Sequence, residues 1–414
     1  MANISQKSYN SAMKKRYYLI VVGGGAAGIF AAIAAKEQNP EVNVLVLEKT
    51  SQLLNKVRIS GGGRCNVTHS CFEPKQLVGN YPRGNKALIG PFTRFQPRDT
   101  IDWFKNRGVD IKTEQDGRMF PTTDSSQTII DCLLTEAGKL GVEIRVKQSI
   151  EKIETGFSIT LVNGETFDSD NLLLATGSSP IGHNYAKQFG HTITELVPSL
   201  FTFNVPHSPF GALSGVSVEK ATISLLNIQM HQAGPLLITH WGFSGPAALK
   251  LSSWAARWLH EKQYQVVIHI DWLPDFSKEK VLLQLKKNRT ENPNQLLPNS
   301  NVFSLPRRLW EKLIQLANLD LKKRNGEFSN EQLQKLADLL KANPFQVNGK
   351  TTYKEEFVTC GGIKLDEVNF RTMESRLQPK LYFAGEILDV DAVTGGFNFQ
   401  NAWTTGWIAG KSMN

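Results

Sequence analysis

The stretch that decides the fold is Tyr18–Ile33, YLIVVGGGAAGIFAAI, followed at residues 42–48 by VNVLVLE. The first apolar run shows no polar alternation, which is typical of a strand buried in a parallel sheet. Glycines end that run, and the Ala-rich residues after them predict a helix over 29–38. The second apolar run completes a strand–helix–strand unit of about 30 residues. This order predicts an α/β fold.

The glycines match a dinucleotide-binding fingerprint, Gly23-x-Gly25-x-x-Gly28. The first glycine permits the tight turn, the second lets the backbone approach a pyrophosphate, and the third lets helix and strand pack closely. Glu48 ends the second strand, where a carboxylate accepts hydrogen bonds from the adenosine ribose. A glycine-rich turn without a ligand is the alternative, and the strand, helix and terminal acid together disfavour it. An acid at position 48 also disfavours a 2′-phosphate, and hence NADP, in this site.

Four further glycine-bearing loops follow predicted strands, at 61–66, 175–177, 361–362 and 385–386. Any one of them is compatible with an ordinary turn. Together they favour a backbone wrapped around a long, extended ligand such as FAD, with Glu386 placed to bind the ribitol hydroxyls. The sequence after Gly395-Gly396 predicts a last helix over 399–411. The N-terminus of that helix, directed at flavin N1 and O2, would stabilise the reduced anionic flavin.

The chain changes character near residue 195 and returns to the first pattern after residue 350. Between these points the sequence predicts short strands over 201–230, a helix over 246–262 and polar helices over 277–342. We therefore expect one discontinuous domain with an insertion rather than two domains in series. The expected division is a disordered tail at 1–15, a first cofactor-domain part at 16–195, an insertion at 196–349 and a second cofactor-domain part at 350–414.

Composition excludes several classes. Hydrophobic residues make up 41% of the 414 residues, enough for real cores. No apolar run reaches the roughly 18–20 residues that span a bilayer, and the polar N-terminus is not a secretory signal. The four cysteines show no C-x-x-C pattern or histidine pairing, so we expect no metal site and no disulfide scaffold. Reduced thiols favour the cytoplasm.

The net charge of +9 raises the question of an acidic partner. Residues 275–325 carry eleven Lys and Arg against five Asp and Glu. These charges are spaced along polar helices, as on solvated faces, and lack the aromatic interleaving of a nucleic-acid platform. We therefore do not expect a nucleic acid or a membrane as partner.

Several longer motifs carry a family resemblance. They are VVGGGAAGIFAAI, LEK, ISGGGRCNVTH, GRMFP, LLLATGSSP, THWGFSGPAAL, TCGGI, TMESR and LYFAGEILDVDAVTGGFNFQNAW. From Tyr18 to Gly410 the chain resembles the BaiN/RdsA-type family of NAD(P)/FAD-dependent oxidoreductases, also described as aminoacetone oxidase-like flavoproteins. The resemblance implies a glutathione-reductase-like FAD-binding Rossmann domain interrupted by an insertion of β-barrel and helical character. The last motif and TCGGI also resemble, more distantly, the succinate dehydrogenase and fumarate reductase flavoproteins.

The resemblance also implies a set of FAD contacts. These are Gly23, Gly25, Ala27, Gly28, Glu48, Lys49, Lys56, Gly62, Gly63, Arg64, Cys65, Asn66, Thr176, Gly177, Glu386, Asp391, Gly396, Phe397 and Asn398. The chain departs from the family pattern at Val57-Arg58, at Ser178-Ser179 and at His69, where asparagine is usual. The His69 change is expected to alter a hydrogen bond to the flavin ring.

Catalytic residues are less clearly marked. His240 and Ser244 flank a Gly-Phe turn before Pro246, and either one is a candidate for substrate contact. A helix cap by Ser244 is the alternative interpretation. Arg64 would hold an anionic substrate, a phosphate or a loop carbonyl. Cys65 has no cysteine partner at redox spacing, so we expect packing rather than a disulfide-reductase mechanism.

The sequence therefore predicts a non-covalent FAD oxidoreductase that passes a hydride through flavin N5. The other substrate is a small organic molecule of amine, carbonyl or enone type. No second GxGxxG occurs, so NAD(P)H would visit the flavin transiently, or O₂ would reoxidise it. Two alternatives remain: an RNA-associated flavoprotein that uses the basic insertion, and a flavoprotein whose FAD is structural or signalling. The oligomeric state is left open.

Overall fold

The computed structural model describes residues 15–351 and 358–413, and its largest sheet is the Rossmann-type sheet predicted above. Five parallel strands run in the order β21 (Leu381–Phe383), β9 (Thr166–Leu174), β1 (Lys15–Val22), β2 (Val44–Leu47) and β6 (Glu143–Arg145). Antiparallel strands β19 (Val368–Asn369), β20 (Glu374–Ser375), β7 (Ile150–Ile153) and β8 (Ser158–Leu161) extend it. The predicted α/β class is confirmed. The predicted tail lies outside the described residues except for Lys15, which opens β1.

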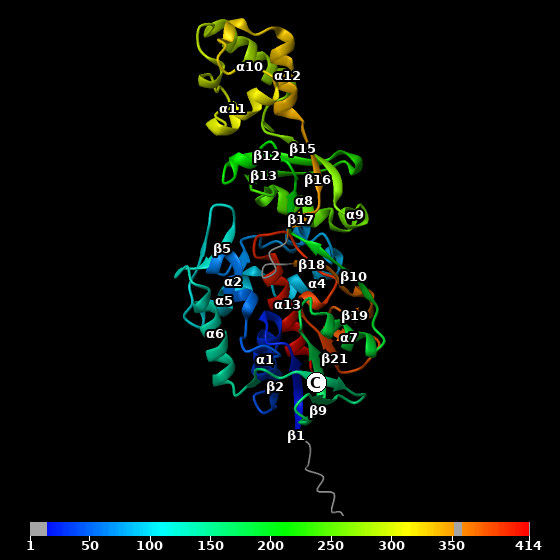
Figure 1. The fold of residues 1–414 in the computed structure, drawn as a ribbon. Helices are drawn as coiled ribbons and strands as arrows, with labels where there is room; N and C mark the ends of the chain where they lie inside the picture. Colours follow the sequence, from blue (N-terminus) through cyan, green and yellow to red (C-terminus); the bar gives the residue numbers. More distant parts are fainter. Residues whose placement is uncertain (1–14, 352–357, 414) are drawn as a thin grey trace, which may run out of the picture.

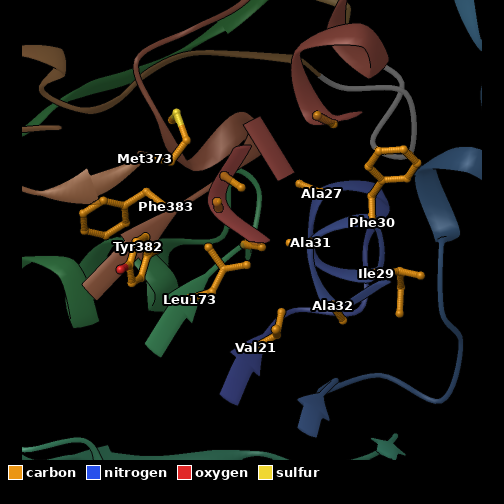
Figure 2. Close-up of a cluster of buried hydrophobic side chains, with 14 of the residues drawn as sticks. Val21, Ala27, Ile29, Phe30, Ala31, Ala32, Leu173, Met373, Tyr382 and Phe383 are labelled. Atoms are coloured by element: carbon orange, nitrogen blue, oxygen red, sulfur yellow. The ribbon is translucent and has the colours of Figure 1, made fainter. Parts of the chain in front are cut away.

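Two helices pack face to face beside this sheet. They are α1 (Ala26–Gln38) and α13 (Phe397–Ser412), which lie next to each other although they come from opposite ends of the chain (Figure 1). A Cβ atom on Gly410 would lie 2.4 Å from the carbonyl oxygen of Ala31, so only glycine allows this approach. Figure 2 shows Ala31 of α1 and Leu173 of β9 within the same buried core.

The remaining elements of this part surround the sheet. They are α2 (Asn55–Gly63), α3 (Pro74–Leu77), α4 (Asn85–Arg94), α5 (Pro97–Lys105), α6 (Ser126–Lys139), α7 (Pro180–Gln188), β3 (Thr68–His69), β4 (Ile111–Thr113) and β5 (Arg118–Pro121). The backbone of α2 is not helical at Ser60–Gly62, where Gly61 and Gly62 adopt left-handed φ angles of 58° and 69°. The predicted glycine-rich loop is therefore present, and a short helix precedes it.

The insertion is built on a second sheet of seven strands. Their order is β16 (Asn343–Asn348), β15 (Gln265–Asp271), β12 (Ser217–Leu225), β13 (Met230–Ile238), β14 (Gly242–Ser244), β11 (Thr202–Asn204) and β17 (Lys350–Thr351). The two end strands are joined by Gly349. Its N–H donates to the Tyr264 carbonyl at 3.0 Å, and its carbonyl accepts from the Asn204 N–H at 3.1 Å. The sheet thereby closes on itself as a small barrel.

Five helices accompany the barrel: α8 (Pro246–Trp254), α9 (Ala256–Glu261), α10 (Lys278–Glu291), α11 (Arg307–Leu316) and α12 (Asn330–Lys341). The single helix expected over 246–262 is wrong in detail, because the chain breaks at Ala255. In Figure 1, α10, α11 and α12 form a separate tier at the end of the molecule farthest from the parallel sheet. No helix in the described ranges is long and apolar enough to cross a bilayer.

The barrel and the Rossmann part are joined by two strands that pair with each other. β10 (Ile193–Ser199) enters the insertion, β18 (Val358–Ile363) leaves it, and the two are antiparallel. Each side has its own hydrophobic cluster, one over the parallel sheet and one inside the barrel and its helices. The expected limits at 195/196 and 349/350 fall within β10 and just before β17. The division into domains stays a prediction.

Candidate active site

A cavity of about 1090 Å³ lies at the carboxyl ends of the parallel strands. Its wall includes Val22 at the end of β1, Leu47 at the end of β2, and Ala175 and Ala384 directly after β9 and β21. Ligands of open α/β sheets bind at this edge. This volume lies just above the roughly 300–1,000 Å³ of small-molecule pockets, so the cavity suits a long ligand.

The first turn of the fingerprint is too tight for side chains. A Cβ on Gly23 would lie 2.5 Å from the Ala175 carbonyl oxygen, and one on Gly28 would lie 2.0 Å from that of Gly23. Gly25 caps α1 without any side-chain hydrogen bond. The first backbone N–H groups of α1 are therefore available to an anionic group in the cavity.

Glu48 is held in one orientation at the end of β2. Its Oε2 accepts from the Gly24 N–H at 2.8 Å, and its Oε1 accepts from the N–H and the hydroxyl of Thr50, both at 2.8 Å. These hydrogen bonds connect the glycine turn at Gly24 to the end of β2 and hold the Glu48 carboxylate on the cavity wall. A carboxylate has about four lone-pair sites, so acceptor capacity remains for a ligand diol.

Another section of the wall combines charge with unsatisfied polar atoms. Lys56 and Glu386 form an ion pair, and Glu386 Oε1 also accepts from the Thr359 N–H at 3.1 Å. Thr176 Oγ1 and Asn401 Oδ1 are buried on this wall and find no hydrogen-bond partner within the described part of the chain. Because buried polar atoms are normally paired, these two atoms fit a ligand rich in hydrogen-bonding groups.

The N-terminus of α13 forms the next section of the wall. Gly396 caps the helix with a φ of 90°, and a Cβ there would lie 2.5 Å from the Thr68 carbonyl oxygen. With its amide correctly oriented, Asn66 accepts from the Gly396 N–H and donates to the Thr68 carbonyl, both at 3.0 Å. Asn398 makes two hydrogen bonds to the backbone of Ala392, at 3.0 and 3.1 Å. The positive helix end is thus fixed toward the cavity.

Most of the predicted FAD contacts are brought together on this one wall. They are Gly23, Gly25, Ala27, Glu48, Lys49, Lys56, Gly62, Asn66, Thr176, Gly177, Glu386, Gly396 and Asn398. Gly28, Gly63, Arg64, Cys65, Asp391 and Phe397 are not on it. Three of these six, Arg64, Asp391 and Phe397, have clear protein partners instead.

Arg64 and Cys65 face the protein rather than the cavity. The Arg64 guanidinium donates to Glu114 at 2.6 Å and lies 4.0 Å from the centre of the Phe120 ring. Cys65 is fully buried, and burial raises the pKa of its thiol to about 12. All four cysteines are free. Neither an anion-binding Arg64 nor a redox Cys65 is supported by these contacts.

Asp391 and Phe397 also have protein partners. Asp391 is fully buried and forms an ion pair with Arg83. The Phe397 ring stacks on His69 with centroids 4.6 Å apart. Burial lowers the pKa of His69, and its Nε2 lies 3.1 Å from the Asp116 carbonyl oxygen. The expected effect of the His69 change, an altered hydrogen bond to the flavin ring, stays a prediction.

Of the catalytic candidates, only Ser244 lies on the cavity wall. His240 is exposed on the turn before β14. The alternative of a helix cap by Ser244 is wrong, because Gly245 is the N-cap of α8 and no side chain caps that helix. Ser244 Oγ instead accepts a hydrogen bond from the Thr202 hydroxyl at 3.0 Å.

Sequence reasoning missed the part of the wall that the insertion and the linking segments supply. It comprises Leu200, Thr202, Leu249, Thr351 and Val358, and the segment 148–150 lines the other end. These residues carry no glycine signature and reach the cavity through tertiary pairing. In the described ranges, no group of three or more His, Cys, Asp or Glu is arranged to hold a metal ion.

Comparisons with known proteins agree with this architecture. Residues 17–412 match the HI0933-like protein Rossmann domain. The chain is 34% identical over 404 residues to the ribosomal RNA dihydrouridine synthase of Escherichia coli (strain K12), covering 93% of this chain and 95% of that protein. It is 27% identical over 398 residues to the 3-dehydro-bile acid delta(4,6)-reductase of Clostridium scindens, covering 93% and 96%.

A solved structure shares the fold. The 3-ketosteroid-delta4-(5alpha)-dehydrogenase from Rhodococcus jostii RHA1 matches with a TM-score of 0.53 at 13% identity, over 98% of both chains. Fold and family together define an FAD-dependent oxidoreductase with a Rossmann-type FAD-binding domain. The chain belongs to the HI0933-like family, and the family resemblance predicted from its motifs is confirmed.

Proposed function

We propose that FAD lies extended and non-covalently bound along the strand ends, in contact with the thirteen predicted residues on the wall. The cavity volume, the fixed Glu48 carboxylate and the Thr176 hydroxyl, which has no partner among the described residues, support this placement. The six predicted residues off the wall would act indirectly, by holding the lining in place. Bound FAD supplies two-electron hydride chemistry, and the protein supplies orientation and electrostatics.

The proposed reaction is reduction of a C=C bond conjugated to a carbonyl group. Two relatives support it, because a uracil ring and a 3-oxo-Δ4,6 steroid both contain such a bond. The observation that carries the proposal is the shared cavity, which runs from the strand ends to Ser244 and Leu249 of the insertion. A substrate held against the insertion would face the N-terminus of α13. NAD(P)H is the proposed electron donor.

Two substrates fit this chemistry. A small enone would enter the cavity whole, as we predicted from the sequence. A uracil base of RNA would enter as the tip of a larger molecule, and the 34% identical relative favours this second candidate. The basic helical tier, in which Lys280, Lys286 and Lys312 form no ion pair with any described residue, would then contact phosphates.

The test is anaerobic reduction followed by turnover. Bleaching of the visible flavin band by NADH or NADPH, and then its return on adding cyclohexenone or ribosomal RNA, would support the proposal and identify the substrate. For RNA, a Lys280→Glu, Lys286→Glu, Lys312→Glu variant should flatten the salt dependence of binding. A flavin that no nicotinamide reduces, or that neither acceptor reoxidises, would contradict the proposal.

A cytoplasmic location is proposed from the free thiols.

A further inference from the structure

One hydroxyl pair stands on the insertion side of the cavity. Thr202 and Ser244 both line it, and the Thr202 hydroxyl donates to Ser244 Oγ at 3.0 Å. Because Ser244 Oγ accepts this bond, its own proton is free to point elsewhere. Within the described part of the chain, no residue accepts a hydrogen bond from the Ser244 hydroxyl. We propose that the Ser244 hydroxyl, oriented and polarised by Thr202, donates to the carbonyl oxygen of the substrate; this inference rests on the proposed function.

The pair is held rigidly by the barrel. In the antiparallel pairing of β11 with β14, Phe203 faces Phe243, so Thr202 and Ser244 form the next pair along the strands. Thr202 is also fixed from its other side, since β11 pairs with β17 at Thr351. Thr202 is 4% exposed and Ser244 is half-buried. Groups on paired strands hold a geometry better than groups on loops do.

Three other polar side chains on the wall have protein partners, whereas Thr176 Oγ1 and Asn401 Oδ1, which have none in the described part of the chain, belong to the section lined by Glu386. Arg118 is paired with Asp116 and Glu114, and the Thr351 hydroxyl donates to Asn204 at 2.9 Å. Asn398 is committed to Ala392, as described above.

The insertion and the linking segments also contribute three apolar side chains to the wall, those of Leu200, Leu249 and Val358. A planar unsaturated ring with one carbonyl fits such a surface, with Ser244 as its donor.

The chemistry explains why a donor is needed at this point. Reduction of the conjugated double bond takes up one hydride at the carbon β to the carbonyl and one proton at the α carbon. NAD(P)H supplies the hydride overall and is oxidised to NAD(P)⁺, and water supplies the proton. After hydride addition the negative charge resides largely on the carbonyl oxygen. A donor fixed before the reaction stabilises that charge more than it stabilises the neutral substrate. The bond from Thr202 strengthens the donor through cooperativity.

Variants of the pair test the inference. We expect Ser244→Ala to lower kcat for cyclohexenone or RNA uracil by about 10²-fold, as loss of one oxyanion donor does, with a smaller change in KM. Ser244→Thr keeps the hydroxyl and should recover most of kcat. Thr202→Val should lower kcat by about 10-fold, because the donor remains but loses its support. Ser217→Ala, an exposed serine of the same insertion, should leave kcat unchanged.

A binding measurement separates this inference from the proposed function. Each oxidised holoprotein is titrated with cyclohexenone while the flavin absorption is followed. Flavin content and the rate of reduction by NAD(P)H should be equal in all variants, and Ser244→Ala should bind the enone several-fold more weakly. If wild type turns over but Ser244→Ala matches it in kcat and binding, Ser244 is not the donor and the proposed function stands. If wild type neither binds nor reduces a carbonyl acceptor, both ideas are wrong.

Discussion

The Asp391 carboxylate and the Arg83 guanidinium form a bidentate ion pair, although the two residues are 308 positions apart in the sequence. Asp391 is fully buried, and Ser199 adds a hydrogen bond to its Oδ2 at 2.9 Å. Arg83 also donates to the Ser253 carbonyl at 2.6 Å, on α8. Four separate segments therefore meet here, two of them leading into or belonging to the insertion. Burial raises the pKa of Asp391, and the Arg83 charge opposes that effect.

Removing one partner of the Arg83–Asp391 pair should lower the stability of the folded protein. We expect Asp391→Asn to lower the free energy of unfolding by about 3–5 kcal/mol, because it leaves Arg83 without its counter-charge in a desolvated place. Asp170→Asn breaks the exposed Arg16–Asp170 pair and should change it by less than about 1 kcal/mol. Urea unfolding followed by tryptophan fluorescence measures both. If Asp391 contacted FAD instead, its variant would lose FAD without losing stability.

Acid should weaken a cluster at the edge of the parallel sheet. Burial alone would raise the pKa of Glu143, but bonds from Lys15, Tyr17 and Arg145 lower it to about 2. The folded pKa lies below the unfolded value, so this stabilisation is present at neutral pH and is lost as the pH falls from about 5 toward 2. Glu143→Gln should cost only about 1 kcal/mol at pH 7, because the carboxylate is one-third exposed.

The measurement for Glu143 is the difference in unfolding free energy between wild type and variant, taken from pH 7 to pH 4. The difference should begin to shrink below about pH 5. Glu41→Gln, at an exposed position, is the control. A difference that stayed constant over this range would show that the cluster does not hold the Glu143 charge.

Glu48 should matter for cofactor affinity. We expect Glu48→Gln to weaken FAD binding by about 10- to 100-fold, since hydrogen bonds to a charged group contribute about 1.5–3 kcal/mol. Fluorescence of FAD titrated into the apoprotein gives the Kd directly. Glu151→Gln, on the exposed side of β7, should bind FAD as wild type does. Equal affinities for Glu48→Gln and wild type would remove the ribose contact from the proposal.

The Cys65 thiol should react slowly with alkylating reagents and should not take part in flavin reduction. With a thiol pKa of about 12, only about one molecule in 10⁴ carries a thiolate at pH 8. Iodoacetamide should therefore label the half-buried Cys71 and Cys132 well before Cys65, as peptide mass spectrometry can show. Cys65→Ala should keep its flavin and its reduction by NAD(P)H. Rapid labelling of Cys65, or loss of flavin reduction in the variant, would reopen a thiol mechanism.

Local patterns predicted the parts of the fold that are locally determined. The first strand, helix and second strand were placed within about three residues, because uninterrupted apolar runs and glycines mark them. The break at Ala255 was missed, since both sides of it have helical patterns. Closure of the barrel through Gly349 depends on strands far apart in the chain, which no local pattern records.

The site divides in the same way. Glu48 ends a buried strand twenty residues after Gly28, and this spacing alone predicts that it faces a ligand, whereas Asn398 was implied only by the family resemblance; both line the cavity. Asp391 also lies in the motif before the last helix, but its partner Arg83 lies 308 residues away in the sequence. The ion pair between them could therefore not be predicted from local sequence. Thr202 reaches the wall only through pairing with β14. For Asp391 and Thr202, tertiary contacts rather than local sequence decided the outcome.

The pairing of β10 with β18 has an evolutionary consequence. Ser199 and Val358 face each other in register, so the chain leaves the Rossmann part and returns to it at one point. A short hairpin turn could bridge these two residues in place of the whole segment 200–357. The insertion is therefore attached at a single point, and with FAD bound as proposed, the part above the flavin could be exchanged without rebuilding the parallel sheet.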